Sequence, residues 1–119
     1  MVDIPTVRRL ALALPQAQDA CTEARLAFMV GGKGFAWSYL ARVAPRKPRQ
    51  PQLDVLAIRC PIERKEMLIE AAPDRFFDDD HYRGYPALLV RLAVIEEDEL
   101  AALLQDAWRM QAPKALTRG

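Results

Sequence analysis

The first hydrophobic residues of the chain recur at the spacing of a helix. Four of them fall at positions i, i+3, i+4 and i+7: Val7, Leu10, Ala11 and Leu14. Asp3 can cap the first turn because its carboxylate accepts backbone N–H groups, and a proline such as Pro5 is tolerated there. Since Pro15 ends the pattern, the sequence predicts a short helix with one apolar face.

Two segments with alternating side chains follow this helix. In residues 25–30, Leu26, Phe28 and Val30 share one side of a predicted strand. Gly31-Gly32 predicts a tight turn into a second strand. Three aromatic residues are expected on one side of that strand: Phe35, Trp37 and Tyr39. An alternating aromatic strand is more often one face of a core than a stacking surface, so both interpretations stay open with the core favoured.

A proline-rich segment then interrupts the alternation. Prolines at positions 45, 48 and 51 exclude regular pairing through its middle, so we interpret residues 41–52 as an extended loop. Residues 53–59 predict a third strand, after which Cys60-Pro61 begins an amphipathic helix that ends at Ala72-Pro73. The inner face of this helix is expected to carry Ile62, Leu68, Ile69 and Ala72.

The last third of the chain predicts one more strand and one more helix. Phe76-Phe77 is expected to anchor in the core, residues 78–86 to form a polar loop and residues 87–92 to form a strand. A final helix begins near Glu96, and its apolar stripe is Leu100, Leu103, Leu104, Ala107 and Trp108. We expect Phe28 and Phe35 to be buried with Leu104 and Trp108.

The predicted order α-β-β-β-α-β-α indicates one α+β domain over residues 1–119, with helices packed against an antiparallel sheet. The 119 residues are 51% hydrophobic, which is enough for one core and excludes global disorder. The apolar run Leu10–Leu14 is far shorter than the ~20 residues of a membrane span. Cys21 and Cys60 are far apart in the sequence, so we expect reduced thiols in a cytoplasmic protein.

Several short motifs, in their order and spacing over almost the whole chain, resemble the MmcQ/YjbR family. They are Ala-Leu-Ala-Leu-Pro at the first helix, Phe-Met-Val-Gly-Gly-Lys-Gly-Phe-Ala at the hairpin, Phe76-Phe77 leading through His81-Tyr82-Arg83-Gly84 to Val90-Arg91-Leu92, and Ala112-Pro113-Lys114 after the last helix. Gln16 stands where the family often has glycine. The resemblance implies a CyaY-like fold, similar to a double-wing fold, and DNA binding.

The residues that could carry catalysis form no recognisable site. Ser38 lies inside a predicted strand with no nucleophile elbow, and His81 lies in a different loop. Cys60 at a helix start could have a lowered pKa, but we expect it to be inert. Asp78-Asp79-Asp80 with His81 suggests metal ligands, yet adjacent side chains diverge in space. We therefore expect no enzyme, no metal and no cofactor.

Charge is distributed unevenly along the chain. Between Glu23 and Asp54 there is no acidic residue, and this stretch carries a charge of +6 while the rest carries −5. Cations beside aromatic rings are typical of nucleic-acid surfaces. We therefore predict weak, largely non-specific nucleic-acid binding, with DNA favoured, through five basic residues: Lys33, Arg42, Arg46, Lys47 and Arg49.

Two alternatives to nucleic-acid binding stay open. The first is a protein-interaction or regulatory module, in which the basic loop docks an acidic partner or another copy of the chain. The second is a small-molecule or enzymatic site, which requires Cys60 and His81 to meet in a pocket.

Overall fold

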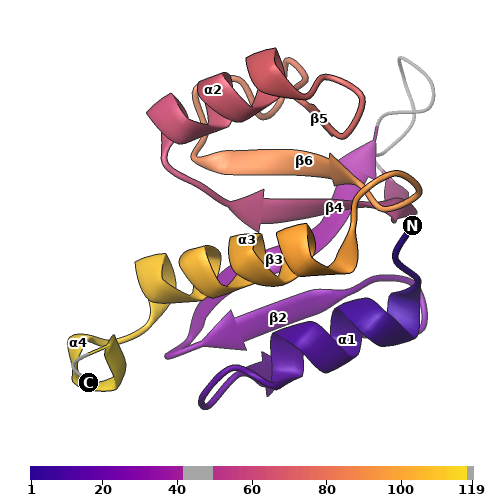
Figure 1. The fold of residues 1–119 in the computed structure, drawn as a ribbon. Helices are drawn as coiled ribbons and strands as arrows, with labels where there is room; N and C mark the ends of the chain where they lie inside the picture. The colour runs from indigo at the N-terminus through magenta and orange to yellow at the C-terminus, as the bar shows by residue number, and fades with distance from the viewer. Residues whose placement is uncertain (42–49, 118–119) are drawn as a thin grey trace.

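The protein is a six-stranded antiparallel sheet with helices packed against it (Figure 1). The computed structural model describes residues 1–41 and 50–117. The elements are α1 (Ile4–Leu12), β1 (Gln18–Asp19), β2 (Ala27–Val30), β3 (Lys33–Ala41), β4 (Gln50–Arg59), α2 (Ile62–Ala71), β5 (Phe76–Phe77), β6 (Ala87–Arg91), α3 (Glu97–Gln111) and α4 (Lys114–Thr117). The predicted α+β class is confirmed, and the short elements β1, β5 and α4 are additions to the predicted order.

The strands follow the spatial order β1-β2-β3-β4-β6-β5, and every neighbouring pair is antiparallel. β4 begins at Gln50, three residues earlier than predicted, and its Pro51 lies opposite Leu40 of β3. β6 pairs with β4 only from Val55 onward, so the first part of β4 has β3 as its one strand neighbour. A proline that donates no hydrogen bond is tolerated at such an edge.

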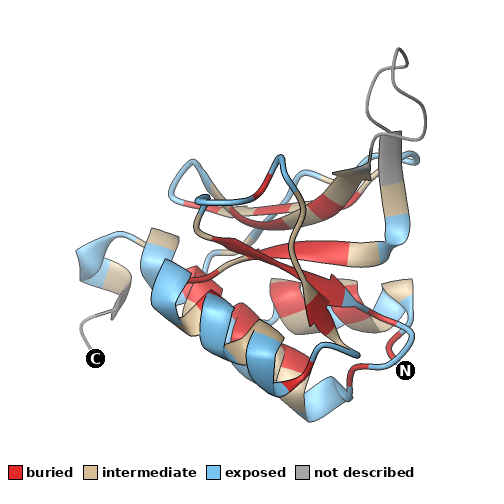
Figure 2. Ribbon diagram, turned by 90° about the horizontal axis from the view of Figure 1, so that it is seen from above, coloured by how far each residue is buried: buried red, intermediate tan, exposed pale blue. Residues whose placement is uncertain are grey.

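The main hydrophobic core lies between the sheet and the helices (Figure 2). The predicted stripe of α3 is buried along its whole length. Phe28, Phe35, Leu104 and Trp108 lie together in this core, each at most 5% exposed, as predicted. The start of α1 also agrees with its prediction, since the side chain of Asp3 accepts a hydrogen bond from the Thr6 N–H at 2.9 Å.

One aromatic residue of β3 faces the opposite way from its expected partners. Phe28 pairs with Ala36 and Met29 with Gly34, so Phe35 is an extra residue in a bulge of β3. It points into the helix-side core, with its ring centroid 6.4 Å from that of Phe28. Trp37 belongs instead to a second cluster on the other face of the sheet. The prediction that Phe35, Trp37 and Tyr39 share one side was therefore wrong, because the bulge shifts the alternation by one residue.

Two motifs that are distant in the sequence meet at the β2–β3 turn. Gly31 has φ +57°, and a Cβ placed on it would lie 2.9 Å from the Cγ and Cδ atoms of Pro113. Just beyond the turn, the Gln111 side-chain amide donates to the Gly34 carbonyl at 2.9 Å. Glycine is needed at position 31 for both its conformation and its close contact.

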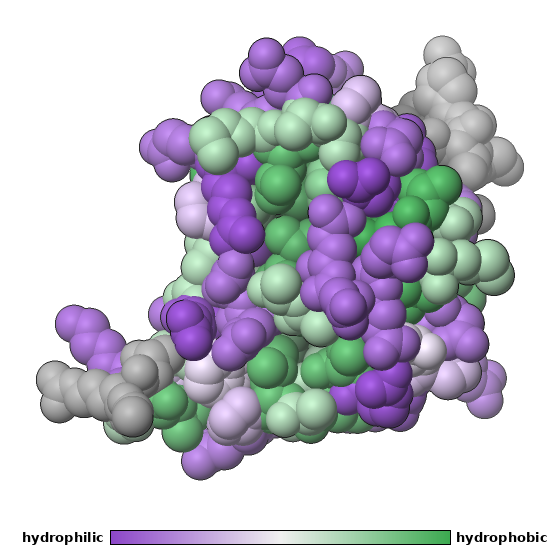
Figure 3. All heavy atoms as spheres, in the orientation of Figure 1, coloured by the Kyte–Doolittle hydropathy of each residue, from purple (hydrophilic) through white to green (hydrophobic). Residues whose placement is uncertain are grey.

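α2 packs differently from its prediction. Leu68 and Ile69 contact the core as expected, but Ile62 is 37% exposed, and Lys65 is the buried residue of the helix. α2 contacts β5 and β6 at the edge of the sheet, and in its first turn Arg64 pairs with Asp106 of α3. On the helix side, hydrophilic side chains cover much of the surface and hydrophobic atoms show in patches between them (Figure 3). In the part of the chain that the structure describes, no helix has both the length and the apolar character to cross a bilayer.

Candidate nucleic-acid interface

The second face of the sheet carries aromatic side chains over small apolar ones. We call it the aromatic face, and it consists of Trp37, Tyr39, Val55, Ala57, Phe77, Tyr82, Ala87 and Leu89. Strand alternation explains its composition, since residues 55, 57 and 59 of β4 and residues 87, 89 and 91 of β6 point the same way. Trp37, Tyr39 and Phe77 are half-buried, so parts of their rings remain accessible.

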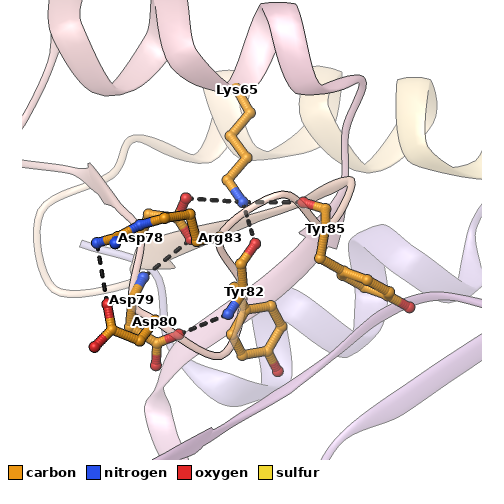
Figure 4. A network of polar contacts seen from close by, with 7 residues as sticks. All are labelled: Lys65, Asp78, Asp79, Asp80, Tyr82, Arg83 and Tyr85. Atoms are coloured by element: carbon orange, nitrogen blue, oxygen red, sulfur yellow. Dashed lines mark hydrogen bonds and ion pairs between the residues drawn. The ribbon is translucent and has the colours of Figure 1, made fainter.

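The loop of residues 78–86 folds against the aromatic face and is held by Lys65 (Figure 4). The Lys65 ammonium donates to the carbonyls of Tyr82 and Tyr85 at 2.7 and 2.9 Å and pairs with Asp78 at 3.0 Å. This satisfies all three donors of a side chain that is 2% exposed. Gly84, at φ +77°, allows the backbone to turn between the two tyrosines.

The three consecutive aspartates of this loop have separate partners (Figure 4). Asp78 pairs with Lys65, Asp80 pairs with Arg83 at 3.0 Å, and Asp79 accepts a hydrogen bond from the Tyr82 N–H at 2.8 Å. Asp79 also accepts from the Tyr39 hydroxyl. Within residues 1–41 and 50–117, no three acidic, histidine or cysteine side chains gather where a metal ion could bind.

Two arginines extend the aromatic face at the ends of its rows. The Arg59 guanidinium lies 4.8 Å from the ring centroid of Tyr85 and 5.7 Å from that of Trp37. The Arg91 guanidinium lies 4.1 Å from the ring centroid of Phe77. These are cation–π distances. Neither arginine has a carboxylate partner among the described residues, so their charges are not neutralised locally.

A pocket of about 370 Å³ opens beside these rings. β3 contributes Trp37 and Leu40, and the 78–86 loop contributes His81, Tyr82 and Tyr85. The Trp37 indole N–H donates to the Tyr82 hydroxyl at 3.2 Å, which joins the two walls. Nothing in the linear sequence brings these residues together, because the loop reaches β3 only through the tertiary fold.

The structure describes one of the five basic residues that the sequence predicts for binding. Lys33 is exposed at the first position of β3, whereas Arg42, Arg46, Lys47 and Arg49 lie outside the described residues. β3 has nine residues, so the backbone of Lys33 lies roughly 26 Å from that of Ala41 at the other end of the strand.

The charge pattern of the sequence does not single out Arg59 and Arg91, although each ends a row of alternate apolar positions. In Val55-Ala57-Arg59 and Ala87-Leu89-Arg91, the arginine continues the second face of its strand. This alternate-position pattern is the signal that would have identified them.

The candidate catalytic residues are kept apart by the sheet. Cys60 is 4% exposed in the helix-side core, and its burial raises the pKa of the thiol, so the thiolate is disfavoured. His81 lines the pocket beside the aromatic face and is exposed. Ser38 is fully buried, and its hydroxyl accepts a hydrogen bond from the Leu26 N–H at 2.8 Å. The structure therefore does not bring Cys60 and His81 into one pocket.

Comparison with known proteins places this architecture among relatives without an assigned role. The chain is 40% identical over 96 residues to uncharacterised proteins of Mycobacterium tuberculosis (Rv2570) and Mycobacterium bovis (Mb2600), covering 75% of this chain and 74% of each relative. The crystal structure of Deinococcus radiodurans protein DR2400, a DUF419 domain, aligns with a TM-score of 0.68 at 20% identity, over 92% of this chain and 78% of that one. This chain and DR2400 therefore have the same fold. A model of the YjbR family matches residues 12–110, which is most of the chain, so the chain belongs to the YjbR family.

Proposed function

We propose that this protein binds nucleic acid weakly and largely without sequence specificity, through the aromatic face and the basic segment at its end. The observation that carries the proposal is the pair Arg59 and Arg91, stacked on aromatic rings and without carboxylate partners in the described part of the chain. Interleaved cations and rings provide phosphate neutralisation and base stacking together.

The contrast with other arginines supports this assignment. Arg25 and Arg109 also lack carboxylate partners in the described part of the chain, but neither lies over an aromatic ring there. The other described arginines form ion pairs with nearby carboxylates: Arg8 with Asp19, Arg9 with Glu97, Arg64 with Asp106, Arg75 with Glu99 and Arg83 with Asp80. Phosphates would have to displace those carboxylates. On the aromatic face a phosphate meets arginines whose charge is not already paired, so less electrostatic energy is lost on binding.

The part of the chain between β3 and β4 carries further positive charge. The segment with Arg42, Arg46, Lys47 and Arg49 joins the end of β3 to the start of β4, the two strands that carry Trp37 and Arg59. The nine residues of β3 span roughly 26 Å, about the axial length of seven to eight nucleotides of one duplex strand. Non-specific binding of this kind has a Kd of about 10⁻⁴ to 10⁻⁶ M.

The proposal describes a binding protein without catalysis. Two features support it: Ser38 is committed to a backbone hydrogen bond, and burial raises the pKa of Cys60. Cys21 and Cys60 are both free thiols, which suits a reducing cytoplasm.

Charge reversal on matched surfaces tests the proposal. Arg91→Glu on the aromatic face and Arg109→Glu on α3 change the net charge equally at two exposed positions. We expect Arg91→Glu to weaken binding to a labelled DNA in fluorescence anisotropy, and Arg109→Glu to have a much smaller effect. Combined replacement of Arg46, Lys47 and Arg49 by glutamate should abolish binding. Binding unchanged by that triple replacement, or absent in the wild type at low salt, would instead favour a protein-interaction module with an acidic partner.

A further inference from the structure

The pocket beside the aromatic face has the size and lining of a site for a planar ring. Its volume of about 370 Å³ lies within the range of small-ligand pockets, roughly 300 to 1,000 Å³. Four of its five lining residues are aromatic: Trp37, His81, Tyr82 and Tyr85. The fifth, Leu40, adds an apolar side chain.

The rings are arranged edge to face, which fixes the walls of the pocket. Tyr85 lies against Trp37 with centroids 6.4 Å apart and against Tyr82 with centroids 6.1 Å apart, at interplanar angles of 72° and 74°. His81 lies against Tyr82 at 5.2 Å and 83°. Because Lys65 holds the loop carbonyls of Tyr82 and Tyr85, these walls are formed before any ligand arrives.

Arg59 places a positive charge beside this pocket, which favours an anionic ligand. Its guanidinium already lies against the rings of Trp37 and Tyr85, so a cationic ligand would meet a like charge there. Arg59 has no carboxylate partner in the described part of the chain, so an anionic group bound at its guanidinium would neutralise an unpaired charge.

We propose that this pocket receives one unpaired base of a single strand, with Arg59 binding an adjacent phosphate. This inference rests on the proposed function and specifies its preferred form of nucleic acid. Tyr82 and His81 supply polar groups for the edge of the base: the Tyr82 hydroxyl accepts from Trp37, and its own hydrogen has no acceptor within the described residues. A base inside a duplex can reach such a pocket only by leaving its stack, which costs energy.

Phosphate contacts alone would not favour a single strand over a duplex. A duplex has the higher charge density, so a protein that contacts only phosphates binds it at least as tightly as a single strand. A preference for the single strand would therefore indicate that a base binds in the pocket, in addition to any contacts with phosphates. Stacking of one base on an aromatic side chain contributes roughly 5- to 150-fold in affinity.

The test compares a labelled ten-nucleotide DNA strand of mixed sequence with the same strand annealed to its complement, at one low salt concentration. We expect the single strand to bind the wild type at least fivefold more tightly. Tyr85→Ala should remove this preference, with little effect on the duplex. Met110→Ala is the matched control, because Met110 on α3 is 40% exposed and Tyr85 is 39% exposed.

Tryptophan fluorescence gives a readout that does not depend on a variant. The single strand should quench Trp37 and leave Trp108, which is buried in the helix-side core, unaffected. Equal or tighter binding of the duplex, with no quenching and no effect of Tyr85→Ala, would overturn the pocket assignment and leave nucleic-acid binding in place. Absence of binding to both forms would overturn the proposed function together with the pocket.

Discussion

Replacing Lys65 with methionine removes the side chain that fixes the 78–86 loop. Methionine keeps most of the buried stem, so the variant loses the ammonium group without leaving a large cavity. Its loss leaves two loop carbonyls without their donor and Asp78 without its ion partner. Removing one member of a buried ion pair costs about 3 to 5 kcal/mol. The Asp78 side chain is 27% exposed and keeps some solvation, so we expect the lower half of this range, about 3 to 4 kcal/mol.

Urea unfolding followed by circular dichroism and tryptophan fluorescence measures this loss. Glu66→Met is the matched control, because Glu66 is the exposed neighbour of Lys65 on α2 and such substitutions change stability by less than about 0.5 kcal/mol. Combining Lys65→Met with Asp78→Asn should recover part of the loss, since the unpaired charge is then removed as well. A cost of Lys65→Met below about 1 kcal/mol would refute the role of Lys65 in holding the loop.

Three further predictions concern other parts of the fold. Trp108→Ala should cost roughly 3 to 5 kcal/mol in urea unfolding, because the ring is buried and its N–H donates to the Pro15 carbonyl at 2.9 Å; a loss below about 1 kcal/mol would contradict its place in the core. Cys60 should react with a thiol reagent far more slowly in the folded than in the urea-unfolded protein, because burial raises its pKa; rapid modification of folded protein below neutral pH would show the reverse. Gln16→Gly should stabilise the protein by about 0.5 to 1 kcal/mol, because Gln16 has φ +54° and glycine adopts this conformation without strain; a drop in the urea midpoint would argue against it.

The longer elements could be predicted from the sequence because their patterns are local. The stripe of α3, the caps of α1 and the glycine turn between β2 and β3 depend on residues within a few positions of one another. The resemblance to the family implies glycine at position 16, and the left-handed backbone of Gln16 is a conformation that favours glycine. β1 and β5 are two residues each, which is too short for any periodicity to show.

The remaining errors came from contacts between distant segments. Lys65 interrupts the apolar stripe of α2, and its burial depends on carbonyls of a loop 17 and 20 residues away. The bulge at Phe35 depends on how β2 and β3 pair, which the alternation of one strand does not show. The pocket joins residues that are far apart in the sequence, as the hydrogen bond between Trp37 and Tyr82, 45 positions apart, illustrates. Arg59 and Arg91 could have been found from strand alternation, but their stacking could not.

The salt dependence of DNA affinity tests the central claim most directly. Binding to a labelled duplex should weaken with salt at a log–log slope of roughly −3 to −4, which corresponds to about four phosphate contacts. Between 50 and 200 mM salt, the affinity should then fall on the order of 100-fold. Fluorescence anisotropy across this range gives the slope. A slope near zero, or no detectable binding at the lowest salt, would contradict nucleic-acid binding by the aromatic face and its basic segment.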